Sequence, residues 1–187
     1  MKVVLASESQ SRKRALDMLG LTHEVHPSAI DEKSIRDTDA AALTKKLTEP
    51  KARKAARPFD DAVVASGDAV VAKDTKLFEK ARSDDEAVEF LRELSDSAFQ
   101  FVTSLTVLRS DTGRMLSAVE TSEIKFRRLE DRGFRDRVAR YPVLRYARAS
   151  RATAFCASLT PSQAATTSSP RCPNRLAVFL TEQGVEV

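Results

Sequence analysis

Three hydroxyls and a basic run meet near the start of the chain, where a short apolar stretch gives way to a helical pattern. Ser7, Ser9 and Ser11 precede the basic run, which begins at Arg12. Backbone N–H groups at a helix start have no helical acceptor, and the positive end of the helix dipole favours phosphate there. Arg12 lies one turn further on, where a guanidinium can fork onto phosphate oxygens. The pattern indicates an anion site, although a serine cap followed by a solvated basic face has the same spacing.

Three carboxylates lie where predicted loops or corners would turn them toward a cleft. Asp31 and Glu32 follow the second predicted strand, and Asp68 comes after Gly67 at a predicted strand corner. Carboxylates beside phosphates suit a hard cation such as Mg²⁺, which takes oxygen ligands and keeps several waters. Each acid taken alone is also the residue type that turns favour.

Two lysines complete the set of candidate residues. Lys51 opens the stretch KARKAAR, and Lys80 lies in LFEKA. Both are near apolar residues that can hold the lysine stem while the ammonium reaches an anion. A solvated surface lysine is the alternative for either position.

The first half of the chain supplies alternating strands and helices to position these residues. The predicted elements are a strand at residues 3–5, a helix from Arg12 to Gly20, a strand within residues 22–32 and a helix over residues 39–57. Pro50 interrupts the last helix because it removes a hydrogen bond. Residues 61–81 predict strand, corner and strand, with the corner at the Gly67-Asp68 dipeptide and a turn at Lys73-Asp74.

The second half predicts a capped helix, a hairpin and two further helices. Ser83 precedes a helix with acids in its first turn and apolar residues on one face. Residues 99–109 and 115–126 are β-rich and are joined by SDTG, so they are expected to pair antiparallel. Helical patterns follow over residues 129–141 and 174–184. The order indicates an α/β domain, a mixed twisted sheet flanked by helices.

Length and composition fit one compact domain over residues 1–187. Of the 187 residues, 42% are hydrophobic and 31% are charged, which is enough to bury a core. The net charge of +4 is small for a chain of this length and does not by itself indicate a nucleic-acid-binding protein. The basic residues 36–57 also lack the interleaved aromatic residues of a base-stacking surface. No apolar run has the length of a signal-peptide core or a membrane span, so we expect a cytoplasmic protein.

The cysteines and histidines predict no special site. Cys156 and Cys172 are the only cysteines, and a chain without an export signal is not expected to build a disulfide framework. His23 and His26 have the spacing of a metal pair. In a strand, however, side chains three positions apart point to opposite faces, so joint ligation is not expected.

Residues 148–173 differ from the rest of the chain. They contain no acid and no glycine, and they have neither a helical nor a strand period. This composition is typical of a linker or a disordered segment. A structureless stretch of this length is unusual inside a compact domain.

The motifs, taken in order, resemble those of a known family. Ser-x-Ser-x-x-Arg, Ile-Asp-Glu, Lys-Ala, Gly-Asp and Glu-Lys with EAVEFLRELS resemble the Maf family of nucleotide pyrophosphatases, within the inosine-triphosphate pyrophosphatase-like superfamily. The similarity covers residues 3 to about 147. It implies two lobes around a central cleft, a homodimer, and hydrolysis of a non-standard or modified nucleoside triphosphate to the monophosphate and pyrophosphate. It also implies a divalent metal cation, Mg²⁺ or Mn²⁺.

The resemblance assigns roles to residues of this chain. The matched positions are Ser7, Ser9 and Arg12 for the phosphates, Lys51 and Lys80 for phosphate charge, Glu32 for the acid after the second strand, and Asp68 for the general base or metal ligand. We therefore expect Glu32 and Asp68 to hold the metal and to act in catalysis with Lys80.

Several positions depart from the family pattern. Ser11 and Ala69 stand at positions linked to base choice, where members that prefer dTTP and UTP carry arginine and threonine. Members similar to 7-methyl-GTP pyrophosphatase lack that arginine but tend to have glutamine where this chain has Ala69. Residues 141–147 resemble the late segment of this second group, so we expect a 7-methyl-GTP-like substrate. Glu79 and Ala81 replace the glycine and proline that commonly flank the second phosphate lysine.

Residues 148–173 carry no family feature. We expect a pair of compensating frameshifts there, because GC-rich codons read out of frame give Ala, Arg, Ser, Thr and Pro, and the resemblance returns at Asn174. A natural divergent loop is the alternative. Loss of the family segment would remove an interior strand and one wall of the base pocket, so we expect lower stability and impaired base recognition. A catalytically impaired nucleotide-binding or interaction protein is the alternative function.

Overall fold

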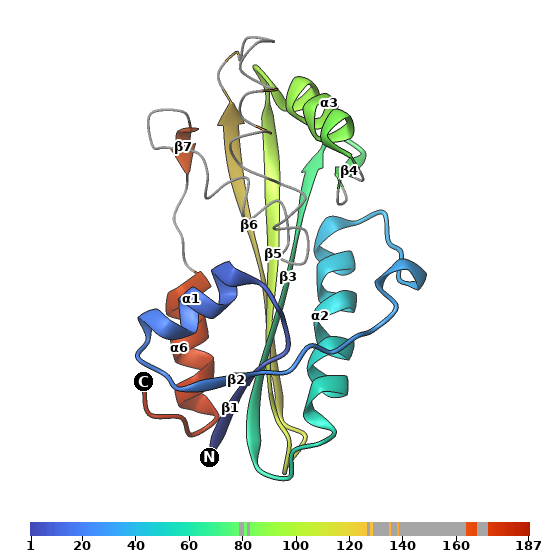
Figure 1. Cartoon of the computed structure of the whole chain (residues 1–187). Coiled ribbons are helices and arrows are strands. Elements are labelled where there is room, and N and C mark those ends of the chain that lie inside the picture. Colours follow the sequence, from blue (N-terminus) through green and yellow to red (C-terminus); the bar gives the residue numbers. More distant parts are fainter. Residues whose placement is uncertain are drawn as a thin grey trace.

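A mixed seven-stranded sheet forms the centre of the molecule (Figure 1). The computed structural model describes residues 1–78, 81, 83–126, 128, 135, 138, 164–167 and 172–187. The strands are β1 (Lys2–Leu5), β2 (His23–Val25), β3 (Ala62–Lys73), β4 (Lys76–Phe78), β5 (Ala98–Arg109), β6 (Met115–Phe126) and β7 (Ala164–Thr167). Their order is β2-β1-β3-β5-β6-β7, and β4 pairs with β3. Since β1 is parallel to β2 and β3 while the other pairs are antiparallel, the predicted mixed α/β sheet is confirmed.

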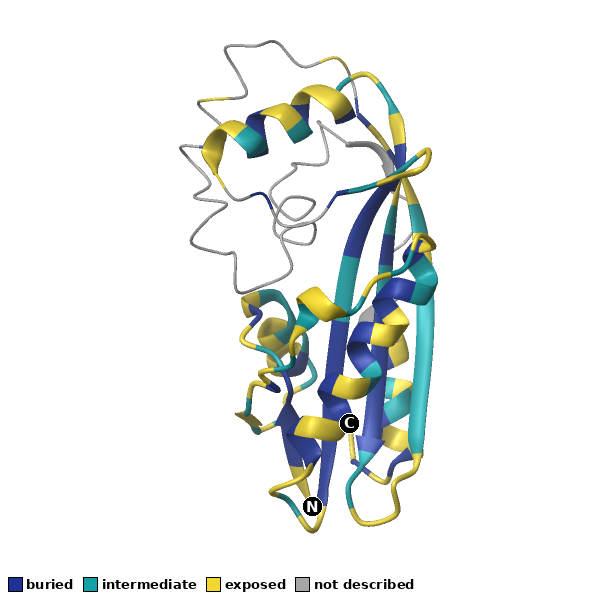
Figure 2. Ribbon diagram, turned by 90° about the vertical axis from the view of Figure 1, so that its right-hand side faces the viewer, coloured by how far each residue is buried: buried dark blue, intermediate teal, exposed yellow. Residues whose placement is uncertain are grey.

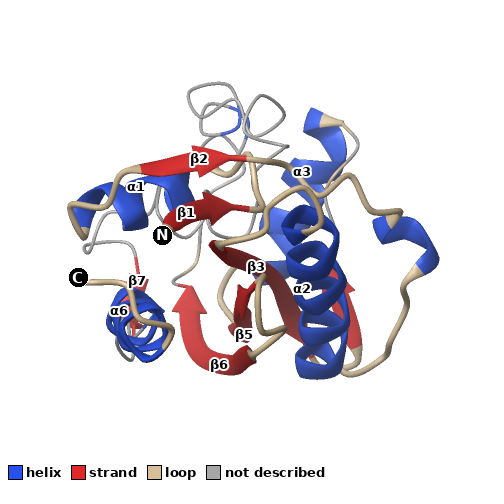
Figure 3. Cartoon of the chain, turned by 90° about the horizontal axis from the view of Figure 1, so that it is seen from below, coloured by secondary structure: helices blue, strands red, loops and turns tan. Residues whose placement is uncertain are grey.

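Helices cover both faces of this sheet (Figures 1 and 3). They are α1 (Gln10–Met18), the 3₁₀ turn η1 (Glu32–Ser34), α2 (Ala40–Ala56), α3 (Asp84–Leu94) and α6 (Cys172–Glu182). Helix α2 packs on one face, whereas α1 and α6 lie together on the other.

Alternation along β3 explains the two cores. Val63 and Ala65 face α1 and α6 in one apolar cluster, whereas Ala62 and Val64 face α2 in another. Successive strand residues point to opposite faces of the sheet, so a strand covered on both sides is apolar throughout. Figure 2 shows the resulting continuous burial of the lower part of β3.

The predicted corner at the Gly67-Asp68 dipeptide is wrong. Strand β3 runs through both residues and pairs with β5 without a break from Val63 to Ala72. The neighbouring strand satisfies the backbone groups on that side, so the chain follows the sheet twist instead of turning. The turn predicted at Lys73-Asp74 is confirmed, and Asp74 adopts a φ of 53° there.

The predicted interruption at Pro50 is also wrong. Helix α2 is one element from Ala40 to Ala56 with Pro50 inside it. The carbonyl of Lys46 loses its usual helical donor because proline has no N–H. Both Pro50 and Lys46 are exposed, so water can bind that carbonyl and the helix continues.

Several other elements agree with the sequence-based expectations. Ser83 caps α3 by accepting a hydrogen bond from the backbone N–H of Glu86, and β5 and β6 form the expected hairpin. Part of residues 148–173 contradicts the linker interpretation, because β7 pairs with β6 and α6 begins at Cys172. The helix expected over residues 129–141 and the remainder of residues 148–173 lie outside the described residues. The two lobes and the central cleft stay a prediction.

Among the helices of the described residues, none combines the length and the apolar character that crossing a membrane requires.

Candidate functional site

The hydroxyls and the arginine at the start of α1 form one hydrogen-bonded cluster. Arg12 donates from Nη1 to Oγ of Ser7 at 2.9 Å, and the backbone N–H of Ser9 donates to the same oxygen at 3.2 Å. The hydroxyls of Ser9 and Ser11 are 2.9 Å apart. The structure therefore brings together all four predicted residues of the anion site.

The start of α1 keeps the properties of an anion site. Ser9 is the N-cap residue, but its side chain makes no capping hydrogen bond. Its hydroxyl is directed instead to Ser11. Because the side chain of Ser9 does not cap the helix, the helix start and the positive end of the helix dipole favour an anion at this position. The simple serine-cap interpretation is therefore not what the structure shows.

The side chain of Arg12 lies across Gly67 of β3. A Cβ atom built on Gly67 would stand 2.9 Å from Nε of Arg12 and 3.2 Å from the carbonyl oxygen of Ser104. Only a residue without a side chain leaves room for this approach. The packing of Arg12 over Gly67 therefore places the cluster at the start of α1 against the middle of β3.

A buried lysine joins two acids on the other face of β3. The ammonium of Lys51 is 2.9 Å from Oε1 of Glu32 and 3.0 Å from Oδ1 of Asp68. The side chains of Lys51 and Asp68 are only 7% and 13% exposed, whereas that of Glu32 is 41% exposed. Glu32 is therefore the member of this cluster that is most exposed to solvent.

Hydroxyls in the core fix the helix that carries Lys51. Ser104 of β5 places its Oγ 2.8 Å from the carbonyl oxygen of Thr44 and 3.2 Å from Oγ1 of Thr48. Oγ1 of Thr48 in turn bonds to the carbonyl oxygen of Thr44 at 3.1 Å. Ser104 also lies directly opposite Asp68 in the β3–β5 ladder. One set of buried bonds therefore holds the lysine helix beside the strand that carries the acid.

Sequence reasoning missed these three hydroxyl residues. The signal was available in part: Thr44 and Thr48 are four positions apart on the buried face of a predicted helix, where polar residues need partners. Their partner Ser104 comes from a distant strand, and the spacing of residues along the chain does not reveal it.

The two clusters approach adjacent residues of β3 from opposite faces. Arg12 lies over Gly67, and Lys51 bonds to the next residue, Asp68. On the edge of β3 that faces β1, the pairing with β1 ends at Ala65 and the pairing with β4 begins at Val71. Within the described residues, the edge of β3 between these two points has no strand partner.

The other predicted site residues lie at or outside this region. Ala69 is partly buried in β3, opposite Thr103 of β5. Asp31 caps η1 by accepting a hydrogen bond from the backbone N–H of Lys33, so it stabilises the turn that carries Glu32. Lys80 and Glu79 lie outside the described residues.

The acids suit a cation that shares its ligands with phosphates. Among the described residues, no three His, Cys, Asp or Glu side chains gather as a complete metal cage. Mg²⁺, however, is usually bound by one or two carboxylates plus substrate phosphates and water. The ammonium of Lys51 shows that Glu32 and Asp68 reach one cationic group together, so these residues fit a divalent ion.

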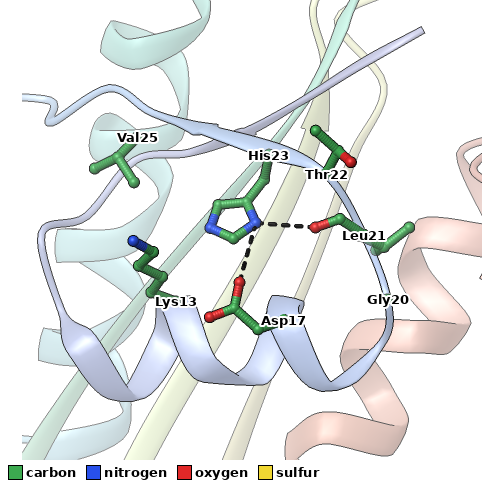
Figure 4. A pocket seen from close by; sticks show the side chains of 7 residues that line it. All are labelled: Lys13, Asp17, Gly20, Leu21, Thr22, His23 and Val25. Carbon is green, nitrogen blue, oxygen red and sulfur yellow. Dashed lines mark hydrogen bonds and ion pairs between the residues drawn. The ribbon is translucent and has the colours of Figure 1, made fainter.

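A separate pocket of about 460 Å³ lies beside α1 and β2 (Figure 4). His23 lies in its wall with Nδ1 3.1 Å from the carbonyl oxygen of Leu21 and 3.8 Å from Oδ1 of Asp17. His26 instead packs edge-on against Phe59, with ring centroids 5.4 Å apart. The two histidines therefore have different surroundings, and neither belongs to the clusters around β3.

Comparisons with known proteins agree with the resemblance. A family profile described as "Maf-like protein" matches residues 2–159. The dTTP/UTP pyrophosphatase of Desulforamulus reducens is 30% identical over 74% of this chain and 71% of its own length. The 7-methyl-GTP pyrophosphatase of Rhizobium meliloti is 33% identical over 72% of this chain and 70% of its own length. Among solved structures, the Ham1 protein of Staphylococcus aureus is 14% identical, with a TM-score of 0.45 over 67% of this chain and 72% of that chain.

Proposed function

Because the chain belongs to the Maf-like protein family, we propose that it is a nucleoside triphosphate pyrophosphatase. The reaction is attack of water on the α-phosphorus, cleavage of the bond to the β-phosphate oxygen, and release of a nucleoside monophosphate and pyrophosphate. One observation supports this most directly: the anion cluster of Arg12 and the acid–lysine cluster of Asp68 meet at adjacent residues of β3.

The start of α1 would bind the phosphate chain. Its N–H groups and the hydroxyl of Ser7 supply donors, and Arg12 supplies a fixed positive charge. Lys51, and Lys80 by family match, would neutralise charge on the departing pyrophosphate. Fixed charges of this kind stabilise charge that develops on the leaving group.

Asp68 would act on the attacking water. Its Oδ1 bonds to Lys51, so we assign Oδ2 to accept the proton. A carboxylate at hydrogen-bond distance can orient water and take its proton in the transition state.

Glu32 and Asp68 would hold the divalent ion, Mg²⁺ or Mn²⁺. When bound, such an ion neutralises phosphate charge and makes a coordinated water more acidic. The exposed position of Glu32 leaves one side of the acid pair accessible to a substrate that brings its own ion.

For the substrate, we propose a non-standard or modified nucleotide similar to 7-methyl-GTP. Ser11 and Ala69 have smaller side chains than the arginine and threonine expected of dTTP- and UTP-preferring members, and their positions flank Arg12 and Asp68 in sequence. The match to the 7-methyl-GTP pyrophosphatase of Rhizobium meliloti supports the same choice. We also propose a cytoplasmic homodimer, by analogy with the family.

Pyrophosphate release from a panel of nucleotides tests the activity. The panel contains 7-methyl-GTP, dTTP, UTP and the four common ribonucleotides, each with Mg²⁺ and with Mn²⁺. We expect turnover to be fastest with 7-methyl-GTP and to require the metal. Tight nucleotide binding without pyrophosphate release would contradict the proposal and support a binding protein of the same fold.

A further inference from the structure

The ammonium of Lys51 stands where the two proposed metal ligands converge. It is 2.9 Å from Oε1 of Glu32 and 3.0 Å from Oδ1 of Asp68, on two different elements of the fold. Burial of the lysine side chain leaves its charge dependent on these carboxylates, since a buried charge needs partners. The lysine therefore connects the two acids through its ammonium.

A divalent ion on the same carboxylates would be repelled by this ammonium. An ion held by Glu32 and Asp68 would share its carboxylates with the ammonium of Lys51, and like charges repel each other strongly in a partly buried site. One lysine and two carboxylates carry a combined charge of about −1, which is a weak attraction for a divalent ion.

A bound triphosphate changes the balance between attraction of the ion by the carboxylates and its repulsion by the ammonium. It brings its own negative charges and oxygen ligands, and the ammonium can bond to those oxygens instead of to the carboxylates. The hydrogen bonds of Thr48 and Ser104 anchor the helix that carries Lys51, so a move of the ammonium needs only the flexible lysine side chain.

We propose that Lys51 is a tethered cation that occupies the metal position in the free protein and moves to the phosphates when a metal-bound triphosphate arrives. This inference rests on the proposed function. Its consequence is that the protein binds a divalent ion weakly by itself and much more tightly together with nucleotide. By reciprocity, the metal must strengthen nucleotide binding by the same factor.

Binding of Mn²⁺ to the full chain tests this coupling without turnover. The free-ion signal is followed by electron paramagnetic resonance, with and without α,β-methylene-GTP, and is corrected for Mn²⁺ bound by the analogue alone. We expect the analogue to tighten Mn²⁺ binding by about tenfold or more, within the usual range of coupling between sites. Equal affinity with and without the analogue would overturn the inference.

Two substitutions on α2 identify the residue responsible. Lys51→Met keeps the length of the stem but removes the charge, so Mn²⁺ is expected to bind tightly without the analogue. Lys45→Met removes a charge from the same helix at an exposed position beside Glu49, so it should behave like the unmodified chain. Weaker Mn²⁺ binding by Lys51→Met than by the unmodified chain would contradict the proposal.

The outcomes separate this inference from the proposed function. If the unmodified chain binds neither Mn²⁺ nor the analogue, the proposed function fails and the inference fails with it. If both bind but without coupling, only the inference is overturned. Should Lys51→Met fail to fold by circular dichroism, the comparison of the unmodified chain with and without analogue decides alone.

Discussion

Arg12 and Gly67 are in such close contact that the arginine occupies the space a side chain at position 67 would need. A Cβ there would stand 2.9 Å from Nε of Arg12. Gly67 precedes Asp68 in β3, so this contact brings the arginine close to the acid in the fold. The position of the guanidinium depends on the space that the glycine leaves.

Gly67→Ala is expected to displace Arg12 and weaken substrate binding. Since the arginine can move more easily than the backbone of Ser104, we expect KM to rise roughly tenfold with a smaller change in kcat. Steady-state kinetics of pyrophosphate release measure both constants. The same substitution in an Arg12→Ala background should then have little further effect, and an undiminished effect there would show that Gly67 acts on something else.

Asp68→Asn is expected to abolish turnover while preserving the fold. The amide has the shape of the carboxyl and can still accept a hydrogen bond from Lys51, but it cannot take a proton from water. We expect kcat to fall at least about 10²-fold, measured as pyrophosphate release. The fold should be kept, but the unfolding temperature should fall because the buried ammonium of Lys51 loses one of its two carboxylate partners. Asp74→Asn, in the turn after β3, is a matched control. Unchanged hydrolysis by Asp68→Asn would remove this residue from the mechanism.

Thr48→Val is expected to destabilise the protein. The substitution preserves volume but removes the hydroxyl that bonds to Thr44 and Ser104 inside the protein. We expect a loss of about 1 kcal/mol in the free energy of unfolding, measured by urea denaturation. Thr103→Val, at a partly buried position with one long bond of 3.4 Å, should cost less. Equal losses for the two variants would indicate that the buried hydroxyls add no particular stability.

The reading frame across residues 148–173 is expected to be shifted in the sequenced gene. Resequencing of independent clones checks this directly. A chain with the restored frame should unfold at a higher temperature and discriminate better between bases, because it would contain the strand and the pocket wall that the family resemblance implies. An intact frame in every clone would establish a natural divergent segment.

Local patterns predicted the elements that depend on nearby residues. Ser83 and the acids after it define the start of α3, and the SDTG turn defines the hairpin of β5 and β6. The errors at Pro50 and at the Gly67-Asp68 dipeptide have another origin. In each case a local preference for a break was outweighed by context: an exposed helix face at Pro50, and a long partner strand at Gly67.

The candidate site was predicted in its residue types but not in its connections. The order of Ser7, Arg12, Glu32, Lys51 and Asp68 identified the parts through a family resemblance. The contact of Arg12 with Gly67 and the shared ammonium of Lys51 depend on how distant elements pack. Such contacts follow from the tertiary fold, which no spacing along the chain specifies.

The two halves of the site depend on separate parts of the core. Leu16 of α1 packs with Leu176 and Leu180 of α6, whereas Ala52 and its neighbours on α2 pack in a cluster of their own. A chain that stopped before Cys172 would therefore lose part of the packing of the helix that carries Arg12 but keep the cluster around the helix that carries Lys51. Truncation there would therefore weaken phosphate binding at the start of α1 more than it weakens the contact of Lys51 with the two acids.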